Sequence, residues 1–355
     1  MDRQFIRPIV KRTGTCIAAA LIATVLGAAP VRAQTLAELA AYAGPDRTAR
    51  LIAGAKKEGT VTLYSSATVA DQSAIVGAFQ AKYGIKVQQW RGSSEDIRTR
   101  ALTEYRGGRY DVDVAETAGP DMEAMQREQV LQPVSTPAAA QLLPQARMPH
   151  GGWIATRLSV FVGAYNTNLI KRADAPKSYE DLRDPRWKGK LGIEVDDGNW
   201  FLTVVSHMGE EKGLALFRDI VRVNGISVRK GHTLLANLVG SGEVPLALTA
   251  YSYRVEQMKN AEGAPVEILY LPPVVAMPTG AGVFKKAPHP NAALLLLDFY
   301  LTDAQKILAD HEAVPTDPRV KAPPKDLIFV DLPKFLDEGD KWTKLFNDTF
   351  VNKAR

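Results

Sequence analysis

The sequence predicts an α/β fold built on a largely parallel sheet, and two observations lead to this prediction. Short β-rich runs alternate with helical segments along the chain. This alternation is typical of parallel strands joined by crossover helices. The chain has 355 residues, 46% of them hydrophobic, and is therefore long enough for two domains with separate cores.

The first half of the chain shows the alternation most clearly. Val61-Thr-Leu-Tyr64 is a short β-rich run, and the helical segment after it stops at Gly84, a residue that favours helix ends. The strands expected here are 61–64, 85–90 and 112–115. The helices expected here are 35–58 with a break at 44–45, a segment ending at 83, and 95–105.

The second half has the same style of elements without an internal sequence repeat. Its expected strands are 154–165, 191–195, 226–229, 244–249 and 280–284. Its expected helices are 200–208, 210–224, 233–241, 291–301, 303–311 and 332–352. Pro272-Pro273 interrupts the pattern between these groups.

Residues 1–33 have the three parts of a secretory signal peptide. Four basic residues come first, an apolar run covers 16–29, and Val31-Arg32-Ala33 places small residues before a cleavage point at Gln34. The alternative is a membrane anchor, but the apolar run is shorter than the roughly 20 residues that span a bilayer. We therefore expect an exported, periplasmic protein that begins at Gln34.

Removal of this segment changes the charge balance of the protein. The full chain has 44 basic and 39 acidic residues, and residues 1–33 hold five of the bases and one of the acids. The remaining chain is nearly neutral, so its charge gives no indication of nucleic-acid binding. Its only cysteine, Cys16, lies in the removed segment, which excludes disulfides and thiol chemistry.

Seven short segments carry a resemblance that extends over nearly all of residues 34–355. They are 61–65, 78–87, 111–114, 165–168 (Tyr-Asn-Thr-Asn), 184–190 (Asp-Pro-Arg-Trp-Lys-Gly-Lys), 242–247 (Gly-Glu-Val-Pro-Leu-Ala) and 279–283. In their order and spacing the chain resembles the bacterial periplasmic solute-binding proteins of ABC importers, in the group containing the ferric-ion-binding proteins.

This resemblance implies a two-lobe periplasmic binding protein fold with a hinged cleft for the ligand. Lobe one would comprise 34–155 plus 272–355, and lobe two 156–271. The chain would cross between two separate sheets near 155–165 and again near 270–280. Ligands of open α/β sheets bind beyond the carboxyl ends of the strands, so ligand-binding residues are expected there.

In the first lobe, polar residues follow each expected strand. Ser65 and Ser66 follow the first strand, Ser93 follows the second, and Glu116 lies at the end of the third. The hydroxyls and helix N-termini could bind an anion, and the carboxylate a metal or an amine. The alternative for each is a helix cap or a helix-start acid.

In the second lobe, Asp196-Asp197-Gly198-Asn199 follows an expected strand, and His232 lies in a turn. We take Asp197, Asn199 and His232 as candidate ligand-binding residues. In the ferric-binding relatives, the loop that matches 196–199 is small, carries serine and holds an anion beside the iron. Two carboxylates in that place repel an anion instead. The histidine is as readily explained as a surface or capping residue.

Tyr251 and Tyr253 are the most specific signal for iron. The ferric-binding relatives carry two adjacent tyrosines after their Gly-Glu-Val-Pro strand, and the phenolates bind the metal. Here Tyr253 matches one of them, Ser252 falls at the other, and Tyr251 stands one place early. On a strand both side chains would share a face, whereas on a helix they would diverge.

Two further departures weaken the iron assignment. Thr68 stands where many relatives have a histidine, and Ala118 where they have a glutamate. If iron is the ligand, we expect Tyr251, Tyr253 and Glu116 to bind it, helped by an acid at 196 or 197. If an organic cation is the ligand, the same rings with Trp200 could enclose it.

The sequence therefore predicts a solute-binding protein that passes its ligand to an inner-membrane ABC permease. Ferric iron is the leading ligand, and a small organic solute bearing an amine or a phosphonate is the alternative. No cofactor is expected, since Fe3+ would be the transported ligand, and we expect a monomer. An envelope enzyme is disfavoured because residues 34–355 lack the common nucleophile, zinc and phosphate-loop motifs. A sensor or scaffold role stays compatible with binding.

Overall fold

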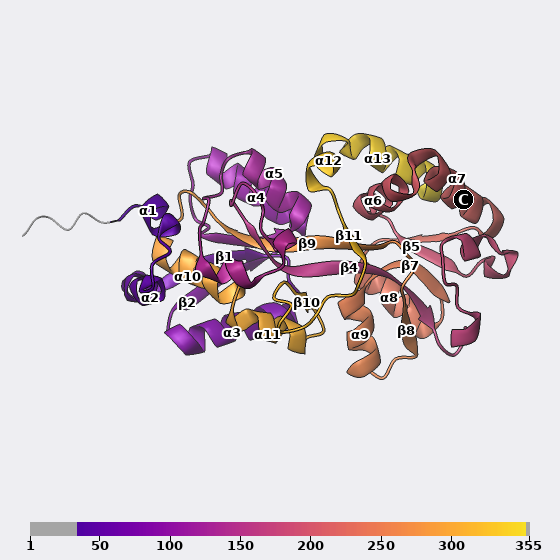
Figure 1. Ribbon diagram of the computed structural model, residues 1–355, viewed down its shortest axis with the longest axis horizontal. Coiled ribbons are helices and arrows are strands. Elements are labelled where there is room, and N and C mark those ends of the chain that lie inside the picture. The colour runs from indigo at the N-terminus through magenta and orange to yellow at the C-terminus, as the bar shows by residue number, and fades with distance from the viewer. Residues whose placement is uncertain (1–33, 353–355) are drawn as a thin grey trace, which may run out of the picture. The chain divides into compact units, whose positions relative to one another are not determined.

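The computed structural model describes residues 34–352, and these form a mixed α/β fold around one curled sheet (Figure 1). The predicted signal peptide, residues 1–33, lies outside the described residues. Along the sheet the strand order is β2-β1-β3-β9-β4-β7-β5-β6, with β8, β10 and β11 paired at its sides. The α/β fold class predicted from the alternation of strands and helices is therefore confirmed.

Most strands lie close to the positions expected from the sequence, but three short strands were not expected and one long strand begins earlier than expected. They are β1 Thr60–Ser65, β2 Lys86–Arg91, β3 Val114–Ala118, β4 Ile154–Asn166, β5 Leu191–Glu194, β6 Ser227–Arg229, β7 Leu246–Tyr251, β8 Val266–Leu269, β9 Val274–Val283, β10 Val314–Pro315 and β11 Leu327–Phe329.

Two groups of parallel strands lie at the ends of the two longest strands. The β1 group consists of β2, β1 and β3, which pair in parallel. The β5 group consists of β7, β5 and β6, which also pair in parallel. Between them, β4 and β9 run antiparallel to each other, and each also pairs with one of the groups (Figure 1).

The helices cover both faces of the two strand groups, as a parallel sheet requires. They are α1 Leu36–Ala41, α2 Arg47–Glu58, α3 Val69–Tyr83, α4 Ser94–Arg106, α5 Gly119–Arg127, α6 Gly198–Met208, α7 Glu210–Asn224, α8 His232–Ser241, α9 Ser252–Asn260, α10 Pro290–Tyr300, α11 Asp303–Asp310, α12 Leu332–Asp337 and α13 Gly339–Phe346. The predicted stop of α3 is confirmed, because Gly84 caps it with a φ of 71°. Within residues 34–352, no helix has the length and apolar character needed to cross a bilayer.

The sheet differs from the expectation of two separate sheets. Its hydrogen bonding is continuous, because β9 pairs with both β3 and β4, and β4 pairs with β7. The physical reason is the length of the two crossing strands, of 13 and 10 residues, which reach from one strand group into the other. The boundaries assigned to the two lobes stay a prediction.

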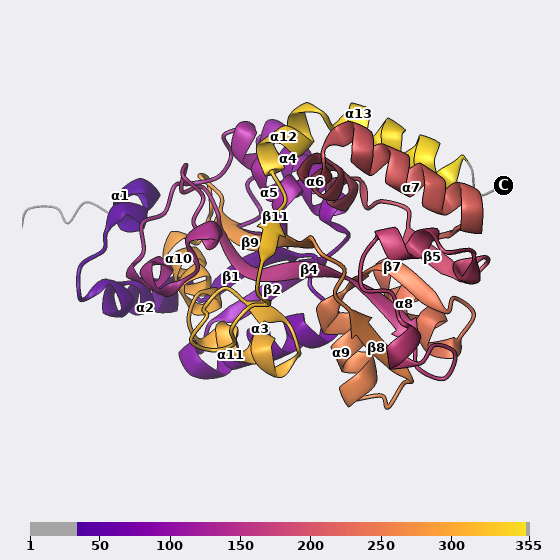
Figure 2. The same cartoon turned by 45° about the vertical axis from the view of Figure 1, so that its right-hand side comes forward.

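The C-terminal segment packs on α6. Trp342, Phe346 and Phe350 are buried, and each makes an edge-to-face contact with Phe201 of α6. Figures 1 and 2 both show α13 beside α6 and α7. In the sequence-based assignment, this C-terminal segment belongs to lobe one. Its apolar side chains contact α6, which the same assignment places in lobe two.

Candidate functional site

A cavity of about 470 Å³ lies at the carboxyl ends of β1, β2, β3 and β7, where ligands of parallel sheets bind. Its lining combines polar, cationic and aromatic side chains. The lining residues are Ser66, Arg91, Gly92, Ser93, Ser94, Ala118, Arg157, Ser159, Tyr251, Tyr253, Met277 and Thr279.

Two larger hollows share no lining residue with this cavity. One of about 590 Å³ lies between α9 and the segment 321–325, and one of about 710 Å³ lies between α7 and the C-terminal residues. If volume alone decided, these two hollows would be preferred as ligand sites. We take the smaller cavity as the candidate ligand site because elements from both strand groups converge on it.

A buried arginine forms part of the cavity wall. Arg157 lies on β4 directly after a register shift between Ala155 and Arg157, and such a bulge re-aims the side chain next to it. Its Nη1 donates to Oε1 of Glu116 at 2.6 Å, and Ser65 Oγ donates to Oε2 at 2.7 Å. Burial lowers the pKa of the guanidinium, but Glu116 and Asp71 offset this effect, and the pKa is raised overall.

Glu116 and Ser65 therefore lie behind the cavity and not in its lining. Both are fully buried, and both carboxylate oxygens of Glu116 already accept a hydrogen bond. The sequence predicted Glu116 as a metal ligand and Ser65 as a ligand contact. In the structure Glu116 pairs with Arg157, because a buried guanidinium requires a charged partner, and Ser65 donates to Glu116. Their predicted roles as ligand contacts stay predictions.

Tyr251 and Tyr253 both line the cavity, although they stand on different elements. Tyr251 ends β7, and Tyr253 lies in the first turn of α9. The two tyrosines therefore share neither a strand nor a helix, which were the two cases considered from the sequence. Their rings are nevertheless stacked, with centroids 5.8 Å apart and planes 18° apart. The pKa of Tyr251 is raised well above its ordinary value by burial and then by Asp197, and burial also raises the pKa of Tyr253.

His232 also stacks on Tyr251. The two rings are parallel to within 19°, with centroids 4.0 Å apart, and Phe161 packs against both. His232 begins α8 directly after Gly231, whose φ of 104° suits glycine alone. The predicted turn thus presents the histidine next to the tyrosines.

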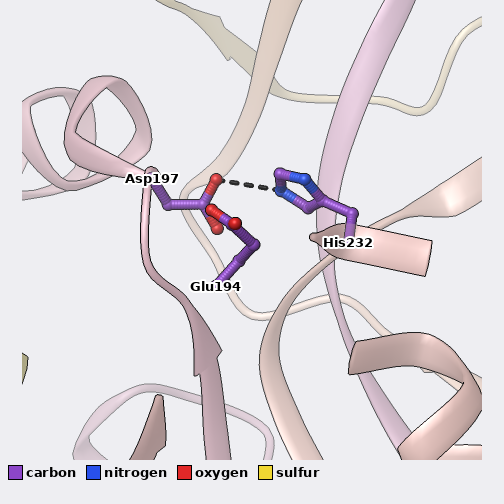
Figure 3. Close-up of side chains that lie close together, drawn as sticks. All are labelled: Glu194, Asp197 and His232. Atoms are coloured by element: carbon purple, nitrogen blue, oxygen red, sulfur yellow. Dashed lines mark hydrogen bonds and ion pairs between the residues drawn. The ribbon is translucent and has the colours of Figure 1, made fainter. Parts of the chain in front are cut away.

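Asp197 lies next to His232, as Figure 3 shows. Its Oδ1 is 2.9 Å from Nε2 of the histidine. Glu194, at the end of β5, is the third member of this cluster, and ligand atoms of all three residues lie within 4.8 Å of one another. Burial lowers the pKa of His232, but Asp197 and Glu194 raise it by more, so these acids favour the imidazolium form.

The remaining predicted residues have local partners of their own. Ser66 lines the cavity and accepts a hydrogen bond from Thr117. Ser93 also lines it, but its hydroxyl caps α4 through Asp96. Asn199 lies outside the lining and donates to the sulfur of Met277.

The suggestion that Trp200 encloses an organic cation is wrong. Its side chain is 1% exposed and packs edge-on against Tyr179 and Phe217 in the core. The reason is the periodicity of α6, which turns Trp200 and Phe201 towards α7 and leaves Asn199 nearer the cavity.

Sequence reasoning missed Arg157 and Glu194. Both carried a signal, because each is a charged residue inside an apolar β-rich run, where a charge is costly unless it is paired. Thr68 and Ala118, which replace a histidine and a glutamate of many ferric-binding relatives, each have a structural position of their own. Thr68 caps α3, and Ala118 lines the cavity at the end of β3.

Comparison with known proteins gives consistent results. The chain is 26% identical to iron uptake protein A1 of Synechocystis sp. over 270 residues, which cover 71% of this chain and 74% of that protein. It is 27% identical to the Fe(3+)-binding periplasmic protein of Serratia marcescens over 250 residues, covering 67% and 72%. Iron-bound HitA from Pseudomonas aeruginosa superposes with a TM-score of 0.70 at 27% identity, over 82% of this chain and 99% of that one.

The match to a family profile covers the region that contains most of the cavity. The profile of the bacterial extracellular solute-binding proteins matches residues 118–328, which include β4, β7 and β9. This match spans more than half of the chain and contains Arg157 and both stacked tyrosines. The chain belongs to the family of bacterial extracellular solute-binding proteins.

Proposed function

We propose that this protein binds ferric iron in the cavity at the strand ends and delivers it to an ABC permease of the inner membrane. The observation that carries the proposal is the stacked pair of Tyr251 and Tyr253 on the cavity wall. Two of the relatives are named for iron uptake or Fe(3+) binding, and HitA was solved with iron.

The chemistry of the two phenols suits a hard, highly charged cation. Without a metal both stay protonated at neutral pH, because their raised pKa values disfavour the phenolate. A trivalent cation reverses this preference, since it binds the phenolate oxygen and releases the proton. Binding therefore weakens on acidification, as protons compete for the same oxygens.

Arg157 gives the cavity a place for an anion that accompanies the metal. Its guanidinium is fixed by Glu116, and the hydroxyls of Ser66, Ser159 and Thr279 lie in the same lining. An anion held there would neutralise part of the cationic charge and complete the coordination of the iron.

One alternative ligand has support from the same lining. An organic phosphate or phosphonate would suit Arg157, Arg91 and the surrounding hydroxyls. An amine would not, because the lining residues of this cavity include no carboxylate. The phosphonate form of the organic alternative is therefore favoured over the amine form.

The test of iron binding is optical. Protein loaded with ferric citrate and then desalted should show a phenolate-to-iron charge-transfer band in the visible region. Tyr253→Phe and Tyr251→Phe should each weaken or shift this band, because each removes one phenolate oxygen. Tyr270→Phe is the matched control, since Tyr270 is 48% exposed in a different hollow and should leave the band unchanged.

A colourless protein without bound metal after this treatment would exclude ferric iron. In that case, binding of inorganic phosphate measured by calorimetry, and its loss in Arg157→Gln, would support the organic phosphate. Retention of the band in both tyrosine variants would remove these residues from the iron site.

The export and delivery route belongs to the same proposal. Residues 1–33 would be cleaved as a signal peptide, and the monomer would act in the periplasm. Lobe one would comprise 34–155 plus 272–338, and lobe two 156–271 plus 339–352, with the terminal segment moved by its packing on α6. The intact mass of the exported protein should correspond to a chain beginning at Gln34.

A further inference from the structure

Glu194, Asp197 and His232 form a cluster that the cavity does not use. None of the three is among the residues that line it, although Tyr251 lies between the cavity and His232. The three side chains come from three elements: the end of β5, the residue before α6 and the first residue of α8. Figure 3 shows the two carboxylates and the imidazole turned towards one another.

Asp197 is the member whose environment points to a ligand. It is 2% exposed, and its Oδ1 contacts His232, but its Oδ2 has no hydrogen-bond partner among residues 34–352. Although it precedes α6, its side chain does not cap that helix. A buried carboxylate oxygen without a partner is costly unless something else satisfies it.

The charge of the cluster points to a cation. Glu194 is 3% exposed, and within residues 34–352 its carboxylate accepts hydrogen bonds only from the backbone N–H groups of Gly231 and Asp196. Within residues 34–352, no lysine or arginine forms an ion pair with Glu194 or Asp197. An imidazolium at His232 offsets only one of the two carboxylates, and a divalent cation bound to the neutral imidazole would balance both.

We propose that Glu194, Asp197 and His232 bind a divalent transition-metal cation of the zinc type, at a second site separate from the solute cavity. One imidazole nitrogen and two carboxylates are a ligand set that zinc accepts, with a fourth position left for water. Ligand atoms that share one ion at roughly 2.1 Å lie about 3.4 Å apart in a tetrahedral shell. The ligand atoms of the three residues lie within 4.8 Å of one another, so side-chain movements of about an ångström would bring them to this spacing.

This site does not depend on the identity of the transported solute. A metal here would tie β5, α6 and α8 together directly beside Tyr251. Its role would be to fix the wall of the cavity, because His232 stacks on that tyrosine. Metal binding to the folded protein also adds to its stability by mass action.

Cobalt is a suitable probe, because Co2+ occupies zinc sites and gives visible d–d bands. The chain from Gln34 onwards should bind one Co2+, and Zn2+ should displace it. Asp197→Asn and His232→Gln should each weaken Co2+ binding by about tenfold or more. His150→Gln is the matched control, since His150 pairs with Glu123 outside the cluster and its loss should leave binding unchanged.

Tyr253→Phe separates this site from the proposed iron site. It should weaken the ferric band but keep Co2+ binding, so that either proposal can fail without the other. Circular dichroism of the metal-free variants checks their folding, and Zn2+ should raise the Tm of the unmodified chain more than that of Asp197→Asn.

Three results would overturn the proposal. The first is no Co2+ binding by the unmodified chain, which would leave the cluster as an ion pair between an imidazolium and two acids. The second is equal loss of binding in His150→Gln, which would indicate adventitious histidine contacts. The third is one-for-one displacement of Co2+ by ferric citrate, which would make the cluster part of the iron site.

Discussion

Arg157 is a buried cation whose position depends on one partner. Its side chain is 11% exposed, and Glu116, with 0% exposure, is the only residue with which it forms an ion pair in the described part of the chain. Buried pairs of this kind add little net stability when both partners are present, but removing one partner leaves an uncompensated charge. The ion pair with Glu116 therefore fixes the position at which the guanidinium of Arg157 faces the cavity.

Glu116→Gln tests this dependence. It should lower the free energy of unfolding by roughly 3 kcal/mol, because Arg157 keeps its buried charge without a counter-charge. Urea unfolding monitored by circular dichroism measures the change. Arg183→Gln is the control, since the pair of Arg183 with Asp219 is largely exposed and should contribute under about 1 kcal/mol. An equal effect of both substitutions would contradict the argument.

Asp121, in the first turn of α5, gives a prediction for pH dependence. Burial raises the pKa of its carboxyl group to about 6, although Arg98 lies 3.1 Å away and opposes the shift. Because the folded-state pKa lies above the unfolded value, the protonated form favours folding at pH 4. That contribution is lost as the pH rises through about 6.

Asp121→Asn removes this titration and should therefore stabilise the protein at high pH only. We expect a gain of about 2 kcal/mol in the free energy of unfolding at pH 8 and almost none at pH 4. Chemical denaturation at both pH values gives the comparison. Asp219→Asn should show no gain at pH 8, because the pKa of exposed Asp219 is lowered by its arginine partners. A gain for Asp121→Asn that is equal at both pH values would refute the pKa explanation.

At the scale of elements, most helices and strands could be predicted from sequence because their periodicity is local. The breaks at Gly44-Pro45 and Gly84 are examples, since a turn residue there ends the regular pattern. The sequence reasoning missed α5, α9, β8, β10 and β11, and began β9 six residues late, at Gly280 instead of Val274. Pairing with β4, 110 or more residues earlier in the chain, holds that part of β9, so no local signal could reveal it.

In the candidate site, too, residues next to recognisable strands could be predicted, whereas contacts between residues distant in the sequence could not. The serines after β1 and β2 were found because they follow recognisable strands. The stacking of Tyr251 on Tyr253 was not predictable, because it arises where β7 turns into α9. The pairing of Glu116 with Arg157 joins two strands that are separated in the sheet by β9.

The N-terminus of α4 allows a test of whether Ser93 caps the helix or binds the ligand. Its hydroxyl accepts from the backbone N–H of Asp96, and the Asp96 carboxylate accepts from the backbone N–H of Ser93. Ser93→Ala should therefore lower the free energy of unfolding by about 1 kcal/mol. Ferric loading at equilibrium should change little. Ser66→Ala is the comparison and should affect loading more than stability. A large loss of loading in Ser93→Ala would give Ser93 a direct role.

For the whole molecule, we propose that β4 and β9, which link the two strand groups, are the connections through which these groups move. The cavity lies where these strands meet residues of both groups, Ser66 and Ser93 from one and Tyr251 and Tyr253 from the other. A ligand that contacts both sides favours the arrangement in which they are closest, because only there are all its contacts made. We therefore expect the strand groups to approach each other on ligand binding.

Spin labels can measure this movement, because residues 34–355 contain no cysteine. Lys86→Cys labels β2, and Lys188→Cys labels the segment before β5; both positions are exposed. The distance between the two labels should shorten when ferric citrate is added, because closure brings the two strand groups together. A second pair, Lys57→Cys on α2 with Lys86→Cys on β2, should keep its distance, because α2 packs against β1 of the same strand group. If both distances stay constant while the charge-transfer band develops, the ligand binds without closure, and β4 and β9 are rigid supports instead of hinges.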